Sequence, residues 1–566
     1  MKLRRFPYML IAGVLVVGIL LGFEIRDVAS GNSDFENFRK IEEAYNFITR
    51  GYVEPVDSSE LAEDAIEGML AGLDPHSVYI NSEEMRSVRE SFDASFEGIG
   101  IYFELIEGPD DTDTLAVLMP IAGGPSDEAG LHAGDRIVQI NDTTAIGFTN
   151  ELVQQYLKGP SGSEVTVHVQ RPGYDERLTF DITRDRIPLE TVIAAYMTDD
   201  HTGYVRLQRF ARTSHAELLE AMRNLQATGM DRLILDLRGN AGGLLEQAWR
   251  IADEFLAAGE MVVYTDSRHG GNNREYRATG GGLFETQPVI VLVDENSASA
   301  SEIVAGAIQD HDRGLIVGRR TFGKGLVQQQ FGLTDGSVLQ MTVSRYFTPS
   351  GRLIQTHYEN GGDESAYFEA KREVREIMEG AGDQGLLDVS RFGDLVPDSL
   401  TYTTDSGRLV FGGGGILPDY LVRIDTVDAA LRTVIGRRLD DGFARERLSR
   451  LGDSFRQQWD DREEAFLDSF EIDNETFASF LAFVGQQGVD VVEVHPVEES
   501  DDPVLVRSEA NASRSDIETR IKAFMARRLF GVEAFYPVVG NIDQTLVEAM
   551  ELWGAASDLA ITRPSR

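Results

Sequence analysis

Between residues 200 and 350 the sequence repeats one pattern, in which a short apolar run is followed by a loop and an amphipathic stretch. Each apolar run has the length of a buried strand, and the runs are Tyr204–Leu207, Leu233–Leu237, Val289–Val293 and Leu315–Val317. Between two of them, apolar residues from Leu244 to Phe255 recur at helical spacing. Because this alternation is typical of a sheet covered by helices, the stretch is predicted to be an α/β core.

The segments on either side follow other patterns. Residues 34–90 are predicted to be helical. Residues 92–185 form short β-branched runs broken by glycine, with one helix near Asn150–Leu157, and have the size of one β-rich domain. The core is predicted over residues 186–425 with a polar insertion at about 357–414, and residues 426–566 are predicted to be a helical extension. The predicted fold class is therefore multidomain α+β.

The N-terminus predicts a location. Lys2, Arg4 and Arg5 precede the uncharged residues 6–23, a run just long enough to cross a bilayer as a helix. Positive charges on this flank place it in the cytoplasm. The alternative is a cleaved signal peptide, but the nearest small-residue site, at residues 28–30, lies beyond three charged residues. We therefore predict an uncleaved single-pass anchor in the inner membrane, with the rest of the chain on the periplasmic side.

Charge and cysteine content exclude several classes of function. The chain has 94 Asp and Glu against 53 Lys and Arg, a net charge of −41, which repels phosphate backbones and argues against a nucleic-acid partner. It has no cysteine, so thiol nucleophiles, disulfides and cysteine-bound metals are excluded. A salt-loving source and GC-rich codon usage both fit this composition. No cofactor and no metal ion are predicted.

Two loops that follow predicted strands carry candidate chemistry, at the edge where open α/β sheets place their sites. In residues 238–244 a strand passes through glycines into a helix, so that backbone N–H groups can point at an anion. Residues 294–302, with the sequence DENSASASE, place serines at a strand-to-helix turn in the positive field of a helix N-terminus. The structural alternatives are a tight turn for the first loop and a helix cap for the second.

A third loop contains Lys324, one of only six lysines, between Gly323 and Gly325. From Gly318 it matches the phosphate-loop pattern, but Gly325 stands where a hydroxyl residue would hold magnesium, and residues 326–333 are predicted to be extended. Nucleotide binding is therefore the least favoured function. The histidines are scattered and no His-Glu-x-x-His segment exists. Lysine is therefore the remaining base that could activate a serine. Burial can lower the pKa of a lysine from about 10.4 towards neutrality.

Three motifs together resemble the carboxy-terminal processing peptidases, a serine–lysine family of tail-specific proteases. They are LDLRGNAGGLL at residues 235–245, NSASASEIVAGAIQ at 296–309 and TFGKGLVQ at 321–328. The resemblance runs in colinear order over about residues 35–425 and covers the insertion before Gly412 and the tail after residue 430 poorly. It implies a crotonase/ClpP-like serine peptidase core with an inserted PDZ domain.

The resemblance also implies residue roles. Ser299 is the nucleophile, Lys324 the general base, and Gln328 the residue that orients the lysine. The backbone N–H groups of Gly243 and Ala300 form the oxyanion hole. Such a site hydrolyses a peptide bond through an acyl-enzyme.

Residues 92–185 are similar to a PDZ domain. The loop Gly98, Ile99, Gly100 and Ile101 resembles the one whose amides capture a terminal carboxylate, after which the peptide adds as a strand to a sheet edge. A plain β-turn is the alternative for these glycines. Arg136 lies at the end of a second PDZ signature. It either assists in binding the carboxylate as a cation or bridges to a surface acid, and we favour the bridge.

The predicted function is a membrane-anchored endopeptidase that binds the C-terminal tails of extracytoplasmic proteins and cleaves upstream of them. The alternative is a PDZ scaffold whose peptidase fold only binds. For residues 430–566 three roles stay open: a homodimer interface, a cap on the active site, or a docking surface for an adaptor.

Overall fold

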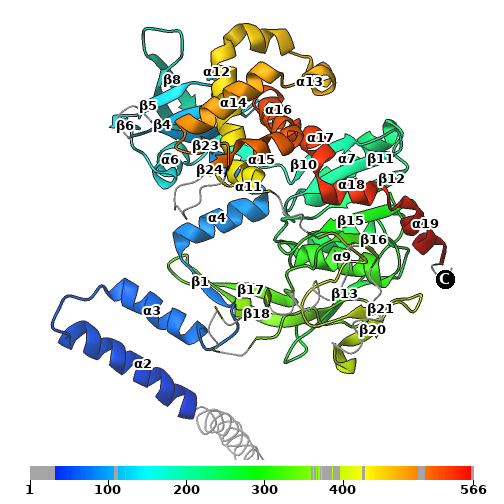
Figure 1. Ribbon diagram of the computed structural model, residues 1–566. Helices are drawn as coiled ribbons and strands as arrows, with labels where there is room; N and C mark the ends of the chain where they lie inside the picture. Colours follow the sequence, from blue (N-terminus) through cyan, green and yellow to red (C-terminus); the bar gives the residue numbers. More distant parts are fainter. Residues whose placement is uncertain are drawn as a thin grey trace, which may run out of the picture. The chain divides into compact units, whose positions relative to one another are not determined.

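The computed structural model divides into two compact units (Figure 1). The residues it describes are 32–107, 112–121, 123–358, 361, 365, 367–369, 371–372, 385–386, 396–423, 428–494 and 504–562. The predicted anchor, residues 6–23, lies outside them. Among the described residues, no helix combines the length and the apolar character that a membrane span requires.

Of the described residues, the smaller unit contains 32–81, 330–341 and 361. Its helices are α2 (Asn32–Gly51) and α3 (Ser58–Leu70). Strand β1 (Val78–Ile80) follows and pairs antiparallel with residues 338–340 at the start of β18 (Val338–Phe347). The prediction that residues 34–90 are helical is therefore wrong at β1. A strand of three residues has no periodicity of its own, and only its pairing with a distant segment makes it a strand.

In the larger unit, α4 (Ser82–Asp93) leads into the β-rich module. Its main sheet has the order β3-β4-β5-β7-β8, with β6 paired to β5, so β3 is an edge strand; β2 pairs with β9. Its core is made of fully buried aliphatic residues such as Leu115, Ile137 and Val167. The elements are β2 (Ser95–Gly98), β3 (Ile101–Glu107), β4 (Asp113–Pro120), α5 (Pro125–Glu128), β5 (Arg136–Ile140), β6 (Thr143–Thr144), α6 (Asn150–Leu157), β7 (Glu164–Gln170), β8 (Leu178–Thr183) and β9 (Asp185–Pro188).

The predicted α/β core is confirmed as a sheet of order β10-β11-β12-β15-β16-β22-β19. Its strands from β11 to β22 are parallel, while β10 and β19 are antiparallel edges. Every residue of β15 is buried, as a parallel strand covered on both faces requires. The elements are β10 (Val192–Met197), β11 (Thr202–Leu207), α7 (Ser214–Ala227), β12 (Arg232–Asp236), α8 (Leu245–Asp253), β15 (Val289–Val293), α9 (Ala300–Asp310), β16 (Leu315–Gly318), β19 (Gly385–Leu386) and β22 (Tyr420–Leu421).

Other strands lie beside this sheet. Strand β13 (Met261–Asp266) pairs antiparallel with β14 (Arg274–Arg277) and with residues 345–347 of β18. Strand β17 (Leu326–Gly332), which also pairs with β18, confirms the extended conformation predicted after Lys324.

The predicted insertion spans about residues 357–414, and the described residues at the end of this range belong to the core. Strands β20 (Thr401–Thr403) and β21 (Leu409–Phe411) form a hairpin. The N–H groups of Gly413 and Gly414 then donate to the carbonyls of Leu353 and Ile354 at 2.8 and 2.9 Å. The insertion therefore ends before this glycine run, because composition alone does not distinguish glycines of a polar loop from glycines packed on a neighbouring backbone.

The C-terminal region has a core of its own, in which aromatic rings such as Phe443, Phe466 and Phe480 pack together. Its last helices instead cover the sheet of the α/β core, where Leu546 and Trp553 pack with residues of that sheet. The elements are α11 (Ala429–Gly436), α12 (Leu439–Trp459), α13 (Glu463–Ser469), α14 (Asn474–Gln486), β23 (Asp490–Val492), β24 (Val504–Val506), α15 (Arg507–Ala512), α16 (Arg514–Phe530), α17 (Phe535–Val539), α18 (Gln544–Met550) and α19 (Trp553–Thr562).

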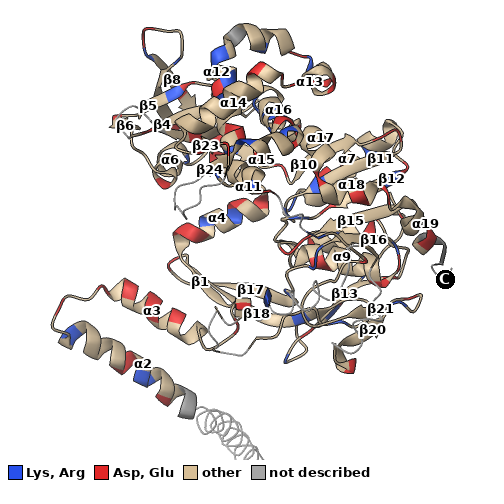
Figure 2. Ribbon diagram, in the orientation of Figure 1, with Lys and Arg blue, Asp and Glu red and all other residues tan. Residues whose placement is uncertain are grey.

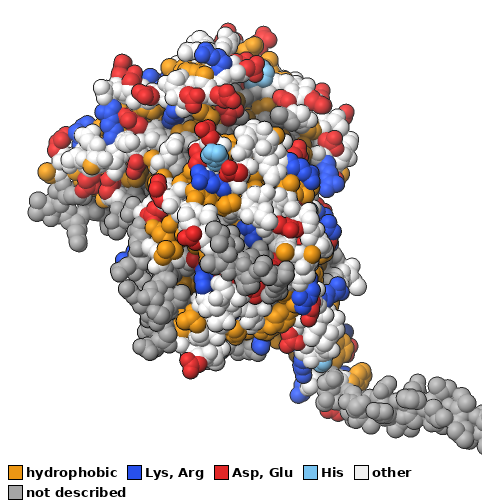
Figure 3. All heavy atoms as spheres, turned by 90° about the vertical axis from the view of Figure 1, so that its right-hand side faces the viewer, with side chains coloured by type: hydrophobic (Ala, Val, Ile, Leu, Met, Phe, Trp, Pro, Cys, Tyr) orange, Lys and Arg blue, Asp and Glu red, His pale blue; other side chains and the backbone are white. Residues whose placement is uncertain are grey.

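Acidic residues occur in many of the helices and strands, and several of them follow one another along α3 (Figure 2). On the face drawn in Figure 3 they are likewise scattered, with arginine and lysine among them. Dispersed acidic residues keep a surface soluble and do not by themselves form a site.

Candidate active site

Ser299 lies in the turn between β15 and helix α9, immediately before the first helical residue. Its φ of +56° is in the left-handed region, which residues with a side chain seldom adopt. The turn is held by the Glu302 carboxylate, which accepts a hydrogen bond from the Ser299 N–H at 2.7 Å. This places a half-buried serine at the positive end of a helix.

The fully buried Glu302 carboxylate also holds the lysine loop. One of its oxygens accepts from the Thr321 hydroxyl at 2.6 Å and from the Gly323 N–H at 2.7 Å. The other accepts from the Lys324 N–H at 2.9 Å, in addition to the Ser299 N–H. Burial raises the pKa of Glu302, although these four hydrogen bonds act in the opposite sense. A single carboxylate thus ties the serine turn to the loop of Lys324.

Tyr346 of β18 supports the same two backbones from another side. Its hydroxyl lies 2.5 Å from the Lys324 carbonyl, to which it donates, and 3.1 Å from the Ser299 carbonyl. Burial, together with the nearby Glu302, raises the pKa of Tyr346 well above its ordinary value, so the hydroxyl remains a donor. The backbones of Ser299 and Lys324 are therefore linked by two buried side chains.

Gln328 lies on β17, four residues after Lys324. The Gln328 Nε2 is buried and has no hydrogen-bond partner among the described residues. A buried amide without a partner is costly in a finished core and is typical of a site that awaits a ligand or a rearranged partner.

The glycine loop packs directly on the serine turn. A Cβ at Gly242 would lie 2.9 Å from both the Ser299 Cβ and the Ala300 nitrogen. Gly243 has a φ of +145°, and a Cβ there would lie 2.2 Å from the Phe210 carbonyl oxygen. Within the described residues, neither the Gly243 N–H nor the Ala300 N–H donates a hydrogen bond. Two unpaired donors are thus present beside Ser299.

Asn240 joins these two loops and is fully buried. Its side chain donates to the Leu207 carbonyl at 2.8 Å and accepts from the Gly242 N–H at 2.9 Å. Its carbonyl accepts from the Ala298 N–H at 3.0 Å and from the Ser301 hydroxyl at 2.8 Å. Both loops are therefore held in one register before any substrate binds.

The sequence patterns predict no role for Glu302, Tyr346 or Asn240. For Glu302 a signal was present, because a serine followed three residues later by glutamate is a capping box. Lys371 is not predicted from the sequence either. Its Nζ lies 2.7 Å from the centroid of the Phe322 ring. Burial, together with the positive charges of Arg320 and Lys324 and against the effect of the Glu302 carboxylate, lowers the pKa of Lys371 to about 7. Lys371 therefore lies within the electrostatic field of the site.

The β-rich module has a groove of about 270 Å³ between β3 and α6. All four residues of the predicted carboxylate loop, Gly98 to Ile101, line it. Ile99 and Gly100 are buried residues, and their N–H groups donate no hydrogen bond within the described part of the chain. Arg136 is exposed on β5 and is not among the lining residues. The cation of the groove is Lys158, paired with Glu90 at 2.6 Å, which sequence analysis did not single out.

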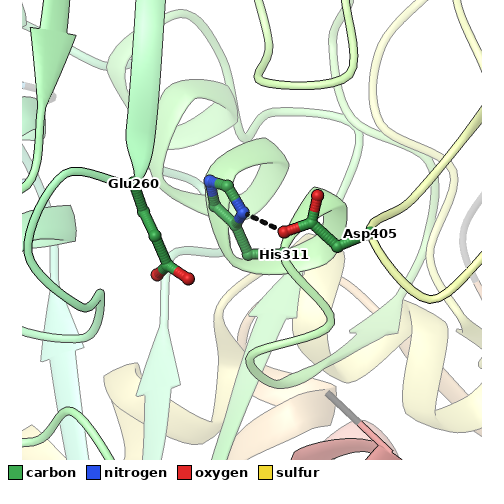
Figure 4. Close-up of side chains that lie close together, drawn as sticks. All are labelled: Glu260, His311 and Asp405. Carbon is green, nitrogen blue, oxygen red and sulfur yellow. Dashed lines mark hydrogen bonds and ion pairs between the residues drawn. The ribbon is translucent and has the colours of Figure 1, made fainter. Parts of the chain in front are cut away.

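A second group of titratable side chains lies at the other end of α9, about 16 Å from Ser299 by helix length (Figure 4). Candidate ligand atoms of Glu260, His311 and Asp405 lie within 4.8 Å of one another. The His311 Nε2 lies 2.7 Å from the Met261 carbonyl and its Nδ1 lies 2.8 Å from the Asp405 carboxylate. Both ring nitrogens of His311 therefore lie against acceptors just after the last residue of α9. The cluster anchors the end of α9.

The fold and its sequence together define a serine-type peptidase with a PDZ domain. Residues 201–361 match peptidase family S41 and residues 117–171 match the PDZ domain. Residues 24–84 match the N-terminal domain of the activating protease CtpB, and residues 431–531 match a family of unknown function, DUF8443.

The chain belongs to the carboxy-terminal processing proteases. It is 36% identical over 352 residues to the carboxy-terminal-processing protease of Bartonella bacilliformis, an alignment that covers 61% of this chain and 79% of the relative. To the protease CtpB of Bacillus subtilis it is 35% identical over 318 residues, covering 56% and 65%. Among solved structures, a photosystem II D1 C-terminal processing protease is 32% identical, with 55% of this chain and 89% of that chain covered and a TM-score of 0.31.

Proposed function

We propose that this protease hydrolyses peptide bonds with a Ser299–Lys324 dyad. Neutral Lys324 takes the proton of the Ser299 hydroxyl as its oxygen attacks the carbonyl carbon of the substrate. The resulting ammonium gives that proton to the leaving amine, and the C–N bond breaks to leave an ester on Ser299. A water molecule, deprotonated by the same lysine, then hydrolyses the ester and restores the serine.

The observation that carries the proposal is the double link between the Ser299 and Lys324 backbones through Glu302 and Tyr346. The unpaired N–H groups of Gly243 and Ala300 supply an oxyanion hole, which is typically worth about 3–4 kcal/mol per donor. In this mechanism Gln328 orients the lysine, for which its buried Nε2, without a partner among the described residues, is available as a donor.

The proposal includes recognition of the substrate by its C-terminus. The Ile99 and Gly100 N–H groups hold the terminal carboxylate, and the apolar lining of the groove, which includes Phe96, Val153 and Leu157, accepts an apolar last residue. The substrates are then proteins with free, apolar C-terminal tails. With the uncharged residues 6–23 as a membrane anchor, these substrates lie on the periplasmic side.

The test is turnover of an unfolded protein with an apolar C-terminus, with products identified by mass spectrometry. Ser299→Ala and Lys324→Ala are each expected to abolish cleavage while tail binding persists. Lys40→Ala, at an exposed lysine of α2, serves as the control. Cleavage that is undiminished in Ser299→Ala would contradict the dyad. Tail binding without turnover by the unaltered chain would favour the scaffold alternative.

A further inference from the structure

A larger cleft lies next to the PDZ groove. It has a volume of about 890 Å³ and is lined by β3 and β4 of the PDZ domain, by residues 189–193 and 208–209 of the peptidase core, and by the C-terminal helices. Most of the C-terminal contribution comes from the segment that matches a family of unknown function.

The cleft is continuous with the PDZ groove, because Phe103 and Leu189 line both. Strand β3 runs from Ile101 in the groove to Glu104 and Leu105 in the cleft. A peptide that pairs with this edge strand advances about 3.3 Å per residue. When the terminal carboxylate of the peptide lies at the loop of Gly98 to Ile101, the peptide residues about five or more positions before the C-terminus reach the cleft.

The cleft also approaches the active site. Gln208 and Arg209 line it, and they immediately precede Phe210. The Phe210 carbonyl accepts a hydrogen bond from the Leu244 N–H at 2.8 Å, next to Gly243. A chain lying in the cleft therefore passes from the PDZ groove towards the glycine loop.

The charge of the cleft is opposite to that of the protein. The chain has a net charge of −41, yet six arginines and only three acidic residues line the cleft. Asp441 pairs with Arg438 and Arg528 at 2.6 Å, and Glu104 pairs with Arg445 at 3.2 Å. Arg209, Arg437 and Arg527 have no ion-pair partner within the described part of the chain. The pKa of Glu190, the remaining acid, is raised by its burial and by the nearby carboxylates of Glu533 and Glu217.

We propose that this cleft is the second half of the substrate-tail site and selects acidic residues upstream of the apolar C-terminus. The inference rests on the proposed recognition of C-terminal tails. The preferred substrate is then an extended polypeptide tail with an apolar end and Asp or Glu beginning about five residues before it. The C-terminal helical region acts as a specificity element, since it supplies Arg437 and Arg527.

The experiment measures equilibrium binding by fluorescence anisotropy, with the full chain carrying Ser299→Ala so that the peptides stay intact. Labelled peptides of about twelve residues share the same apolar end and differ upstream, where they carry Glu, Gln or Lys. The cleft variant is Arg437→Gln with Arg527→Gln. Its matched control is Arg450→Gln with Arg462→Gln, which removes two exposed arginines of the same region that do not line the cleft.

The expected result is that the Glu peptide binds about ten-fold more tightly than the Gln peptide, and the Lys peptide more weakly than both. The cleft variant reduces this preference to within about two-fold and leaves the Gln peptide unaffected, and the control variant keeps the full preference. Equal binding of the Glu and Gln peptides, or a preference that survives in the cleft variant, would overturn the inference alone. If amidation of the C-terminus does not weaken the binding of any peptide, the proposed tail recognition is contradicted, and this inference is contradicted with it.

Discussion

The carboxylate of Glu302 lies 2.7 Å from the backbone nitrogen of Ser299, within the same turn that gives Ser299 its positive φ. The same oxygen lies 2.9 Å from the Lys324 nitrogen. A strained serine turn and a lysine loop are thus stabilised by one buried acid. Strain of this kind persists only where the surroundings over-determine it.

Glu302→Gln is expected to lower kcat/KM by about 100-fold, because an amide has one oxygen and cannot accept from both pairs of donors. The shift in the Ser299 turn acts on catalysis, so peptide binding to the PDZ groove is expected to stay unchanged. Glu295→Gln, in the same loop, is the matched control. Full activity of Glu302→Gln would show that its hydrogen bonds do not position the dyad.

Tyr346→Phe removes the hydroxyl that donates to the Lys324 carbonyl and leaves that carbonyl without this donor. The variant is expected to lose about 1–2 kcal/mol in free energy of unfolding, measured by urea denaturation, and to lose kcat with little change in KM. Tyr264→Phe on β13 is the control, since its ring stacks on Phe347 outside the dyad. Equal kcat values in the two variants would contradict a positioning role for Tyr346.

Gly243→Ala is expected to abolish most activity, because the added Cβ would lie 2.2 Å from the Phe210 carbonyl and displace the Gly243 N–H. The loss of one oxyanion donor typically lowers kcat by about 100- to 1,000-fold. Gly271→Ala, where a Cβ meets no atom within 4 Å, is expected to retain activity. Tail binding by the Gly243→Ala variant distinguishes loss of the donor from unfolding, because an unfolded variant would not bind. A folded variant that cleaves normally would refute the assignment of the Gly243 N–H to the oxyanion hole.

Lys371 predicts a pH dependence of stability. Its pKa is about 7 in the folded protein and about 10.4 in an unfolded chain. Between these values the unfolded state binds more protons, so the free energy of unfolding rises with pH from about 7 to about 10. Lys371→Met is expected to remove this contribution, measured as the difference from the unaltered chain in urea denaturation at the two ends of the window.

For comparison, Lys40→Met, at an exposed site, is expected to leave the slope unchanged. A slope that is identical in Lys371→Met and in the unaltered chain would mean that Lys371 is hydrated in solution and that its pKa is not lowered.

Much of the fold could be predicted because its pattern is local. The helix predicted near Asn150–Leu157 and the strand predicted at Val289–Val293 are both found at those residues. The helical spacing of the first and the unbroken apolar run of the second record which faces are buried. Strand β1 was missed because it has only three residues and is stabilised by pairing with β18, whose residues follow more than 250 positions later.

By itself, the sequence determined the strand and helix periods, the three loops at the strand ends, and the choice of serine, glycine and lysine within those loops. The tertiary structure decided how the loops are held. Tyr346 meets Ser299 across 47 positions of the chain, and Asn240 meets Ser301 across 61. Such hydrogen bonds leave no periodic trace, because they form only when the folded sheet brings distant loops together and burial excludes water from them.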